Sequence, residues 1–363
     1  MEIVLAQPKD NEPLIKFLQQ SPVPGLVDLS IARQDSFFKI YDIQSKDYDT
    51  FIIKDENDNV HGVFTLLFRE AMIDDVPQII GYTTDLRLGV QREALVTWAR
   101  NFLPLMQESM HKRSCKYMFS ILSSGQSFLK ARAVDRQIPR YQLLRRFDIV
   151  TINGRIPYLT GPLPTLKVRA GQKKDLDALA GFIRLKSKGR PLAYSFAGNE
   201  FEKMIYAWPG FDISNFLIAF DSLDNIVGCV APWDSSLLQK YYVINYHGSI
   251  VGYRKIFYMG SLLGISRQLP AKNRPLNFKF LSHLYVNNHD IFQTLLYHAY
   301  KQCRKKEFLT YVQFEGDIIL SVPKYFISWS APFGLYNLGA PEMNRSLQPS
   351  PLLPAPILEP ALI

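Results

Sequence analysis

The 363-residue sequence contains only three cysteines, Cys115, Cys229 and Cys303. They are far apart, odd in number and without metal-type spacing, so they predict free thiols in a reducing compartment. The N-terminus lacks the basic stretch and long apolar run of a signal peptide. No stretch is long enough for a transmembrane helix, so we expect no membrane partner. These absences favour a cytoplasmic protein.

The sequence also lacks the motifs of several enzyme classes. The six histidines are scattered, and His283, His289 and His298 do not have the spacing of metal ligands, so no metal is expected. No Ser-His-Asp or Cys-His arrangement is suggested, and neither a Walker motif nor a dinucleotide-type glycine fingerprint is present. The sequence therefore gives no sign of a metal site, of a nucleophilic triad or dyad, or of a nucleotide-binding loop of these types.

The composition is that of a folded protein, with 47% hydrophobic, 21% charged and 13% aromatic residues. The length predicts about two domains. The net charge is +9, and the basic residues gather in several clusters. Such clusters are either solvated surface or a site for a polyanion, which would be a phosphorylated cofactor or a nucleic acid.

A repeat of about 165 residues divides the chain. Val4–Asp10 and Val168–Asp175 each read as a short strand and a polar turn that closes on an aspartate, before apolar residues at helical spacing. We expect both aspartates to cap the following helix through their carboxylates. The hairpins at Phe51–Phe64 and Phe216–Val230 have the same Asp-Asn-apolar-X-Gly exit, with Gly62 and Gly228 separated by a similar offset. Two matches in register indicate a tandem duplication.

The later elements correspond with a larger offset. Each half continues with a long strand, a helix and another strand. In the first half these are expected at Ile79–Leu88, Gln91–Met106 and Lys116–Leu122. In the second half they are expected at Phe278–Val286, His289–Arg304 and Phe308–Phe314. Leu95, Trp98, Ala99 and Phe102 are expected on the inner face of the first of these helices. The second half carries a tyrosine-rich insertion, roughly Trp233–Pro275.

These elements predict residues 1–160 as one domain, 161–340 as a second and 341–363 as a proline-rich tail. Prolines and glycine near 157–164 indicate the linker between the domains. The tail contains little that could pack, so we expect it to be flexible or docked only as an extended arm.

The order of elements resembles the GNAT superfamily of N-acetyltransferases, and the chain looks like a tandem member. The resemblance is clearest in the hairpin that ends Asp58-Asn59-Val60-His61-Gly62 and in the strand Gly81–Leu88 with its following helix. It implies an α/β class, α+β with a mixed sheet, built from two tandem acetyltransferase-like domains. It also implies acetyl-CoA as co-substrate and an amine, in a small molecule or a peptide, as acceptor.

In this superfamily, the central strand splays from its neighbour, and the pantetheine arm lies in the gap with the pyrophosphate over the next helix. The resemblance implies a cofactor site in the first half, formed by Leu86, Arg87, Leu88, Gln91, Arg92, Glu93, Ala94 and Gln126. The sequence departs from the pattern because no glycine follows Arg92 and because Glu93 brings a negative charge. The second half departs further at Val286–Ile291, where Asp290 is expected to cap a helix.

Acetyl transfer needs a base for the amine and a proton for the leaving thiolate. Asp85 is the candidate base, although it could instead orient Arg87 or cap a loop. Tyr141 is the candidate proton donor, by the resemblance, although a buried structural tyrosine has the same signal. Arg92 could pair with a phosphate or lie exposed at a helix start.

Three functions fit these observations. The first is an acyl-CoA-dependent N-acetyltransferase with its site in the first half. The second is a non-catalytic pair of acetyltransferase-like domains that binds a ligand or partner through Leu237–Tyr258. The third is a nucleic-acid binder, which we rank last because no nucleic-acid module is recognisable. The acceptor and the oligomeric state are not predicted.

Overall fold

The computed structural model describes residues 1–123, 139–156, 166–194, 200–248, 250–339 and 354–362. Within these residues, fourteen strands join into one mixed system. The main path runs β1-β3-β4-β5-β6-β14-β7-β13-β12-β10-β9-β8. The strands are β1 Glu2–Leu5, β2 Val27–Arg33, β3 Asp47–Lys54, β4 Val60–Ile73, β5 Val76–Leu88, β6 Tyr117–Ser123, β7 Arg140–Arg155, β8 Lys167–Ala170, β9 Leu217–Phe220, β10 Ile226–Trp233, β11 Gln239–Tyr246, β12 Pro275–Val286, β13 Glu307–Phe314 and β14 Phe326–Gly339.

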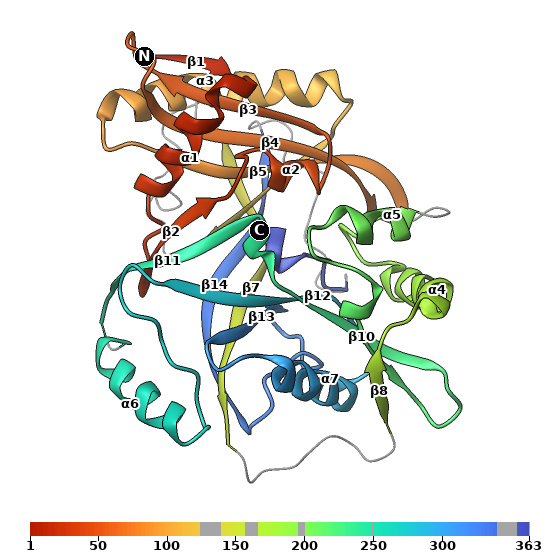
Figure 1. Cartoon of the computed structure of the whole chain (residues 1–363). Helices are drawn as coiled ribbons and strands as arrows, with labels where there is room; N and C mark the ends of the chain where they lie inside the picture. Colours follow the sequence, from red (N-terminus) through yellow and green to blue (C-terminus); the bar gives the residue numbers. More distant parts are fainter. Residues whose placement is uncertain (124–138, 157–165, 195–199, 249, 340–353, 363) are drawn as a thin grey trace.

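Helices cover both faces of each half, as Figure 1 shows. They are α1 Asn11–Gln20, α2 Lys39–Asp42, α3 Arg92–Lys112, α4 Leu176–Ser187, α5 Glu200–Ala207, α6 Ile250–Leu262 and α7 His289–Gln302. Alternating residues of β3 pack to opposite sides, since Phe51 and Ile53 join the core under α3 whereas Ile52 joins the core under α1. The mixed α/β class is therefore confirmed.

The two halves exchange their last long strands. β14, from the second half, lies between β6 and β7 of the first half, and β7 in turn pairs with β13. The antiparallel β7–β14 pair places Phe147 opposite Phe333, with the rings stacked at 5.9 Å. The sheet is thus continuous through the middle of the molecule (Figure 1). The predicted linker lies outside the described residues, and the division into two domains stays a prediction.

The repeated elements form as predicted, but the repeated aspartates do not cap the helices. Asp10 and Asp175 each end a short 3₁₀ turn, and their carboxylates accept the backbone N–H of Gln7 and Gln172, each at 2.8 Å. Neither makes a side-chain capping bond to α1 or α4. Each carboxylate bonds the backbone N–H at the start of its own turn, so it does not cap the helix that follows. The expected cap at Asp290 is also wrong, since Asn288 accepts from the N–H of Ile291 at 3.0 Å.

Helix α3 is longer than predicted and is rotated slightly from the predicted face. It continues past Pro104 to Lys112. Trp98 and Phe102 are buried as expected, but Leu95 is half exposed and Ala94 is buried in its place. The close approach of the helix to the sheet selects the small side chain at the inner position.

The end of the tail packs against the second half, which corrects the expectation that it had little to pack. Ile357 and Ala361 are buried in the core beneath α4 and α5. The Ile357 N–H donates to the carbonyl of Pro191 at 3.0 Å, and the chain ends in a 3₁₀ turn, Pro360–Leu362. Apolar residues among the prolines thus join the core of the second half.

A second, smaller set of pairings ties the insertion to the first half. β11 pairs antiparallel with β2 along most of its length and briefly with β12. The three cysteines are free and buried. Among the described residues, no helix has both the length and the apolar composition needed to cross a membrane.

Candidate active site

The central strands of the first half separate at the predicted place. β5 and β6 are parallel and pair from Ile80–Tyr117 to Thr83–Ser120. Beyond Thr83, β5 continues to Leu88 with its other edge on β4, and β6 continues to Ser123 with its other edge on β14. The backbone of β5 from Thr84 to Leu88 therefore has no partner in β6.

The predicted cofactor residues gather at the end of this splayed strand. Leu86 and Leu88 pack with Ala94 in the core under α3. Gln91 is the N-cap residue of α3 but makes no side-chain capping bond, and Gln91, Arg92 and Glu93 are exposed. The first turn of a 21-residue helix is thus presented to solvent without a side-chain acceptor. Gln126 lies outside the described residues.

The charge of Glu93 is countered within the first half. Its Oε1 lies 2.9 Å from the terminal ammonium of Met1. This contact raises the pKa of the ammonium through the hydrogen bond to Glu93. The negative charge that the sequence places near the helix start is therefore paired with a cation.

Tyr141 lies on β7 and reaches the same core from the other side of the splay. It packs against the cluster that holds Leu86 and Leu88, and its ring meets that of Tyr336 edge-on at 6.2 Å. Burial raises the pKa of Tyr141, so its phenol is protonated at neutral pH. The structure thus brings the predicted donor and the predicted strand residues to one region.

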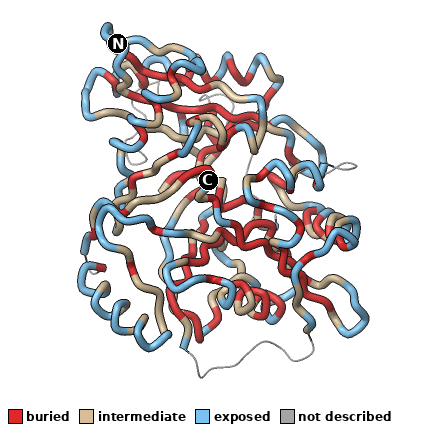
Figure 2. The backbone as a smooth tube through the Cα atoms, in the orientation of Figure 1, coloured by how far each residue is buried: buried red, intermediate tan, exposed pale blue. Residues whose placement is uncertain are grey.

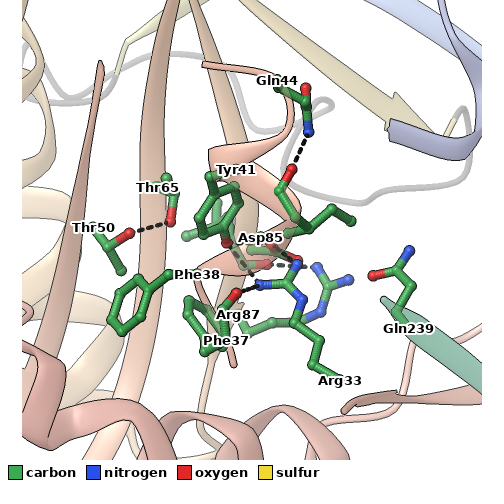
Figure 3. A network of polar contacts seen from close by, with 12 residues as sticks. Arg33, Phe37, Phe38, Tyr41, Gln44, Thr50, Thr65, Asp85, Arg87 and Gln239 are labelled. Carbon is green, nitrogen blue, oxygen red and sulfur yellow. Dashed lines mark hydrogen bonds and ion pairs between the residues drawn. The ribbon is translucent and has the colours of Figure 1, made fainter. Parts of the chain in front are cut away.

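Asp85 is held in a buried network that the sequence did not reveal. Its carboxylate accepts hydrogen bonds from Arg33 of β2 and Tyr41 of α2, and the side chains of Arg33 and Asp85 are 3% and 9% exposed. Arg33 also donates to Tyr41 Oη at 3.0 Å and to the carbonyl of Phe37 at 2.7 Å. Figure 3 shows these side chains converging from three elements, with Gln239 of β11 beside them.

This network controls the ionisation of Asp85. Burial alone would raise the pKa of Asp85, but Arg33 and Arg87, together with the Tyr41 hydrogen bond, outweigh it and hold the pKa below its usual value. Burial would lower the pKa of Arg33, yet Asp85 keeps that pKa raised. Both shifts favour the charged forms, and Asp85 pairs with Arg33, whereas Arg87 donates to the carbonyl of Leu86 at 2.9 Å.

The second half repeats the splay but closes it. β12 and β13 pair from Asn277–Glu307 to Phe280–Thr310 and then separate. The tail contacts both strands, and the Glu359 carboxylate accepts the backbone N–H of His283 at 3.3 Å. The start of α7 is capped by Asn288. In the second half, the tail and Asn288 thus occupy the places that correspond to the strand edge without a partner and the helix start without a side-chain cap in the first half.

His283 was not selected as a site residue from the sequence. Its side chain is fully buried, with Nδ1 3.2 Å from Glu359 Oε1. The ring stacks on Phe216 and Trp208, at centroid distances of 5.5 and 5.2 Å. Glu359 lies 76 residues away in the sequence, so no local pattern could connect the two. Among the described residues, no group of His, Cys, Asp and Glu is arranged to hold a metal ion.

No protein-family model matches the sequence, and no curated protein matches it. Among solved structures, Saccharomyces cerevisiae N-myristoyltransferase with bound myristoyl-CoA superposes on 93% of this chain and 82% of that chain, with a TM-score of 0.58 at 9% identity. A second structure of the yeast enzyme gives 0.59 at 8% identity, with 93% and 79% covered. A GCN5-related N-acetyltransferase from Sphaerobacter thermophilus gives 0.47 at 11% identity, with 79% of each chain covered.

The likeness to the yeast structures covers nearly the whole chain and shows a shared fold. The mixed α/β fold expected from the order of elements is thereby confirmed, and the division into two tandem domains stays a prediction. Because the identity is only 8–9%, the likeness is one of fold alone.

Proposed function

We propose that the chain is an acyl-CoA-dependent N-acyltransferase whose single cofactor site lies between β5 and β6 of the first half. The observation that carries this proposal is the difference between the two splays. In the first, the edge of β5 that faces β6 has no strand partner from Thr84 to Leu88, and the helix start has no side-chain cap. The second is filled by the tail and capped by Asn288. The yeast structures, which share this fold, hold myristoyl-CoA.

The two parts of the site suit the two parts of the cofactor. The amide groups of a pantetheine arm can pair with the free edge of β5 as an added strand would. The pyrophosphate would meet the exposed N–H groups of the first turn of α3, where the helix dipole favours an anion. Arg92, at that turn, supplies a charged donor. These contacts do not require the glycines that the phosphate loop lacks.

The reaction would be the attack of a neutral amine on the thioester carbonyl. The carbon–nitrogen bond forms, the carbon–sulfur bond breaks, and the amine proton passes to a base. The leaving thiolate takes a proton, for which Tyr141 is our candidate donor because it packs in the same core as Leu86 and Leu88. We expect Tyr141→Phe to lower kcat more than KM, as the loss of a group that acts in the transition state does.

For Asp85 we now propose a positioning role in place of the base. Its lowered pKa makes it a weak proton acceptor, and both Arg33 and Tyr41 occupy its carboxylate. What it does instead is hold β5, through Arg33, against β2 and α2. The amine would then arrive neutral or lose its proton to another group or to water.

Acetyl-CoA remains our proposed donor, with a longer acyl chain as the variant suggested by the yeast structures. The acceptor would be an amine of a small molecule or a peptide. Binding of acetyl-CoA and myristoyl-CoA can be compared by calorimetry on the full chain. Release of free coenzyme A on addition of candidate amines separates an enzyme from a protein that only binds.

The decisive variant is Arg92→Glu, matched with Lys174→Glu. Both residues are exposed cations near a helix start, but Lys174 lies in the second half. We expect Arg92→Glu to weaken binding by about tenfold or more, since a charged donor to phosphate becomes a like charge, and Lys174→Glu to leave it unchanged. Equal effects of the two variants, or no binding of either acyl-CoA at millimolar concentration, would refute the proposal.

A further inference from the structure

Helix α6 turns an apolar face to solvent. Ile256, Met259, Leu262 and Leu263, at and just beyond its C-terminal half, are 62%, 66%, 71% and 74% exposed. In an α-helix these positions share one side, opposite to Arg254 and Ser261. The helix lies at the edge of the molecule in Figure 1 and is largely exposed in Figure 2. The apolar side of α6 therefore faces solvent, whereas an ordinary surface helix turns its apolar side toward the core.

The inner side of α6 is firmly attached. The guanidinium of Arg254 lies 4.7 Å from the Tyr246 ring centroid, and the Phe257 ring meets Trp329 edge-on at 6.3 Å. Ser266 Oγ donates to the Phe257 carbonyl at 2.9 Å, and a side chain at Gly260 would come within 2.5 Å of that hydroxyl. These contacts hold the inner side of α6 in place, so its apolar face stays exposed to solvent.

The charge around α6 is of one sign. Between Asp234 and Asp290 the sequence has seven lysines and arginines and no acidic residue, so this stretch supplies most of the net charge of +9. Lys255 lies on the exposed side of the helix, and Lys272 and Arg274 are exposed in the segment that returns to β12. Carboxylates from other segments contact this stretch, since Glu307 lies 3.2 Å from Lys279 and Asp28 of β2 lies 2.6 Å from His247.

We propose that the exposed face of α6 docks on a lipid surface that carries anionic headgroups. A protruding helix needs no complementary groove in a fluid layer, and its aliphatic side chains can enter below the headgroups while Lys255 meets the phosphates. Tyr253 and Tyr258, each about half exposed, have the amphipathic rings that favour the boundary. With 13 residues, α6 is too short to span a bilayer, so it would lie along the surface.

Charge selects this occupant over a second copy of the chain. A two-fold interface through α6 would set one cationic insertion against another, with Lys255 near its own copy, and like charges at an interface oppose association. An anionic surface turns the same charges into attraction. The proposal does not depend on acyl transfer.

Co-sedimentation with vesicles tests the proposal on the full chain. We expect binding to phosphatidylcholine mixed with phosphatidylserine, weaker binding to phosphatidylcholine alone, and release by salt. The double variant Ile256→Asp/Met259→Asp should lose binding by about tenfold or more, and Lys255→Glu should lose about tenfold on the anionic vesicles only. Both change exposed side chains, and unchanged thermal unfolding midpoints would show that the variants fold.

The matched control is Leu223→Asp/Ile318→Asp, which places two charges at residues 80% and 79% exposed outside α6. It should bind vesicles as the unaltered chain does. Absence of binding to either vesicle would overturn the proposal. So would binding that the α6 variant retains, or a concentration-dependent dimer that the α6 variant abolishes without any effect on lipid binding.

Discussion

Asp85 and His283 occupy the same position in the two halves. Each has a left-handed backbone, with φ of 52° and 50°, at a bulge in the central strand, β5 or β12. Each side chain meets an oppositely charged or ionisable group from a distant segment, Arg33 for Asp85 and Glu359 for His283. A bulge that re-aims a side chain is common next to functional sites. Here the duplicated bulge holds an ion pair in one half and the chain's own tail in the other.

Removing one partner of the buried pair of Arg33 and Asp85 should destabilise the fold strongly. Removing one partner leaves an uncompensated buried charge, so Asp85→Asn or Arg33→Met should each lower the free energy of unfolding by about 3–5 kcal/mol. The double variant Arg33→Met/Asp85→Leu should recover most of that loss, since neither charge remains. Urea denaturation measures all three. As a control, Glu108→Gln in an exposed pair should leave the midpoint unchanged.

The same pair predicts a dependence on pH. A carboxylate whose folded pKa lies below its unfolded value stabilises the fold above the unfolded pKa and loses that effect as pH falls toward the folded pKa. The stability difference between the unaltered chain and Asp85→Asn should therefore be constant above about pH 5 and shrink below about pH 4. A difference that stays constant down to about pH 3 would mean that Asp85 is not the group responsible.

The glycine at the exit of each hairpin should resist substitution for a steric reason. A Cβ at Gly228 would lie 2.5 Å from Ile291 Cγ2 and 3.1 Å from Leu295 Cδ1, both on α7. We expect Gly228→Ala to lower the free energy of unfolding by about 1–3 kcal/mol through overpacking. Gly181, in the interior of α4, has open space around it, so Gly181→Ala should instead stabilise by roughly 0.5–1 kcal/mol. Thermal denaturation of the two variants compares them directly.

The contact of Glu359 with His283 should hold the tail in the second splay. Glu359→Gln removes the charge that faces the imidazole and the N–H of His283, so we expect faster hydrogen exchange in β12 from Leu281 to Val286. Glu315→Gln, at an exposed residue, is the control. Protection of β12 that is the same in both variants would show that the tail is held by its apolar residues alone.

Local patterns were enough to predict the repeated elements. The spacing of apolar residues and the Asp-Asn turns placed both hairpins, the central strands and the helices that follow them, because those signals lie within short stretches. The turns confirm this in detail, since Asp55 and Asp221 each accept the N–H groups of residues two and four positions later. The capping of α1 and α4 was wrong because the same carboxylate can close a turn or cap a helix.

Contacts between residues far apart in the sequence could not be predicted from such short patterns. Arg33 and Asp85 are 52 residues apart, and β14 reaches β6 across the whole second half. The tail was judged by its prolines, although a few apolar residues beside them were sufficient for packing. The exposed face of α6 was visible only as an aromatic-rich insertion, since the sequence does not say which side of a helix is covered.

A structure of the full chain with coenzyme A would show directly whether the first half holds the cofactor. We predict the pantetheine arm between β5 and β6, the pyrophosphate over the first turn of α3 near Arg92, and the tail still in place against His283. Coenzyme A between β12 and β13 with the tail displaced, or no density at saturating coenzyme A, would contradict this prediction.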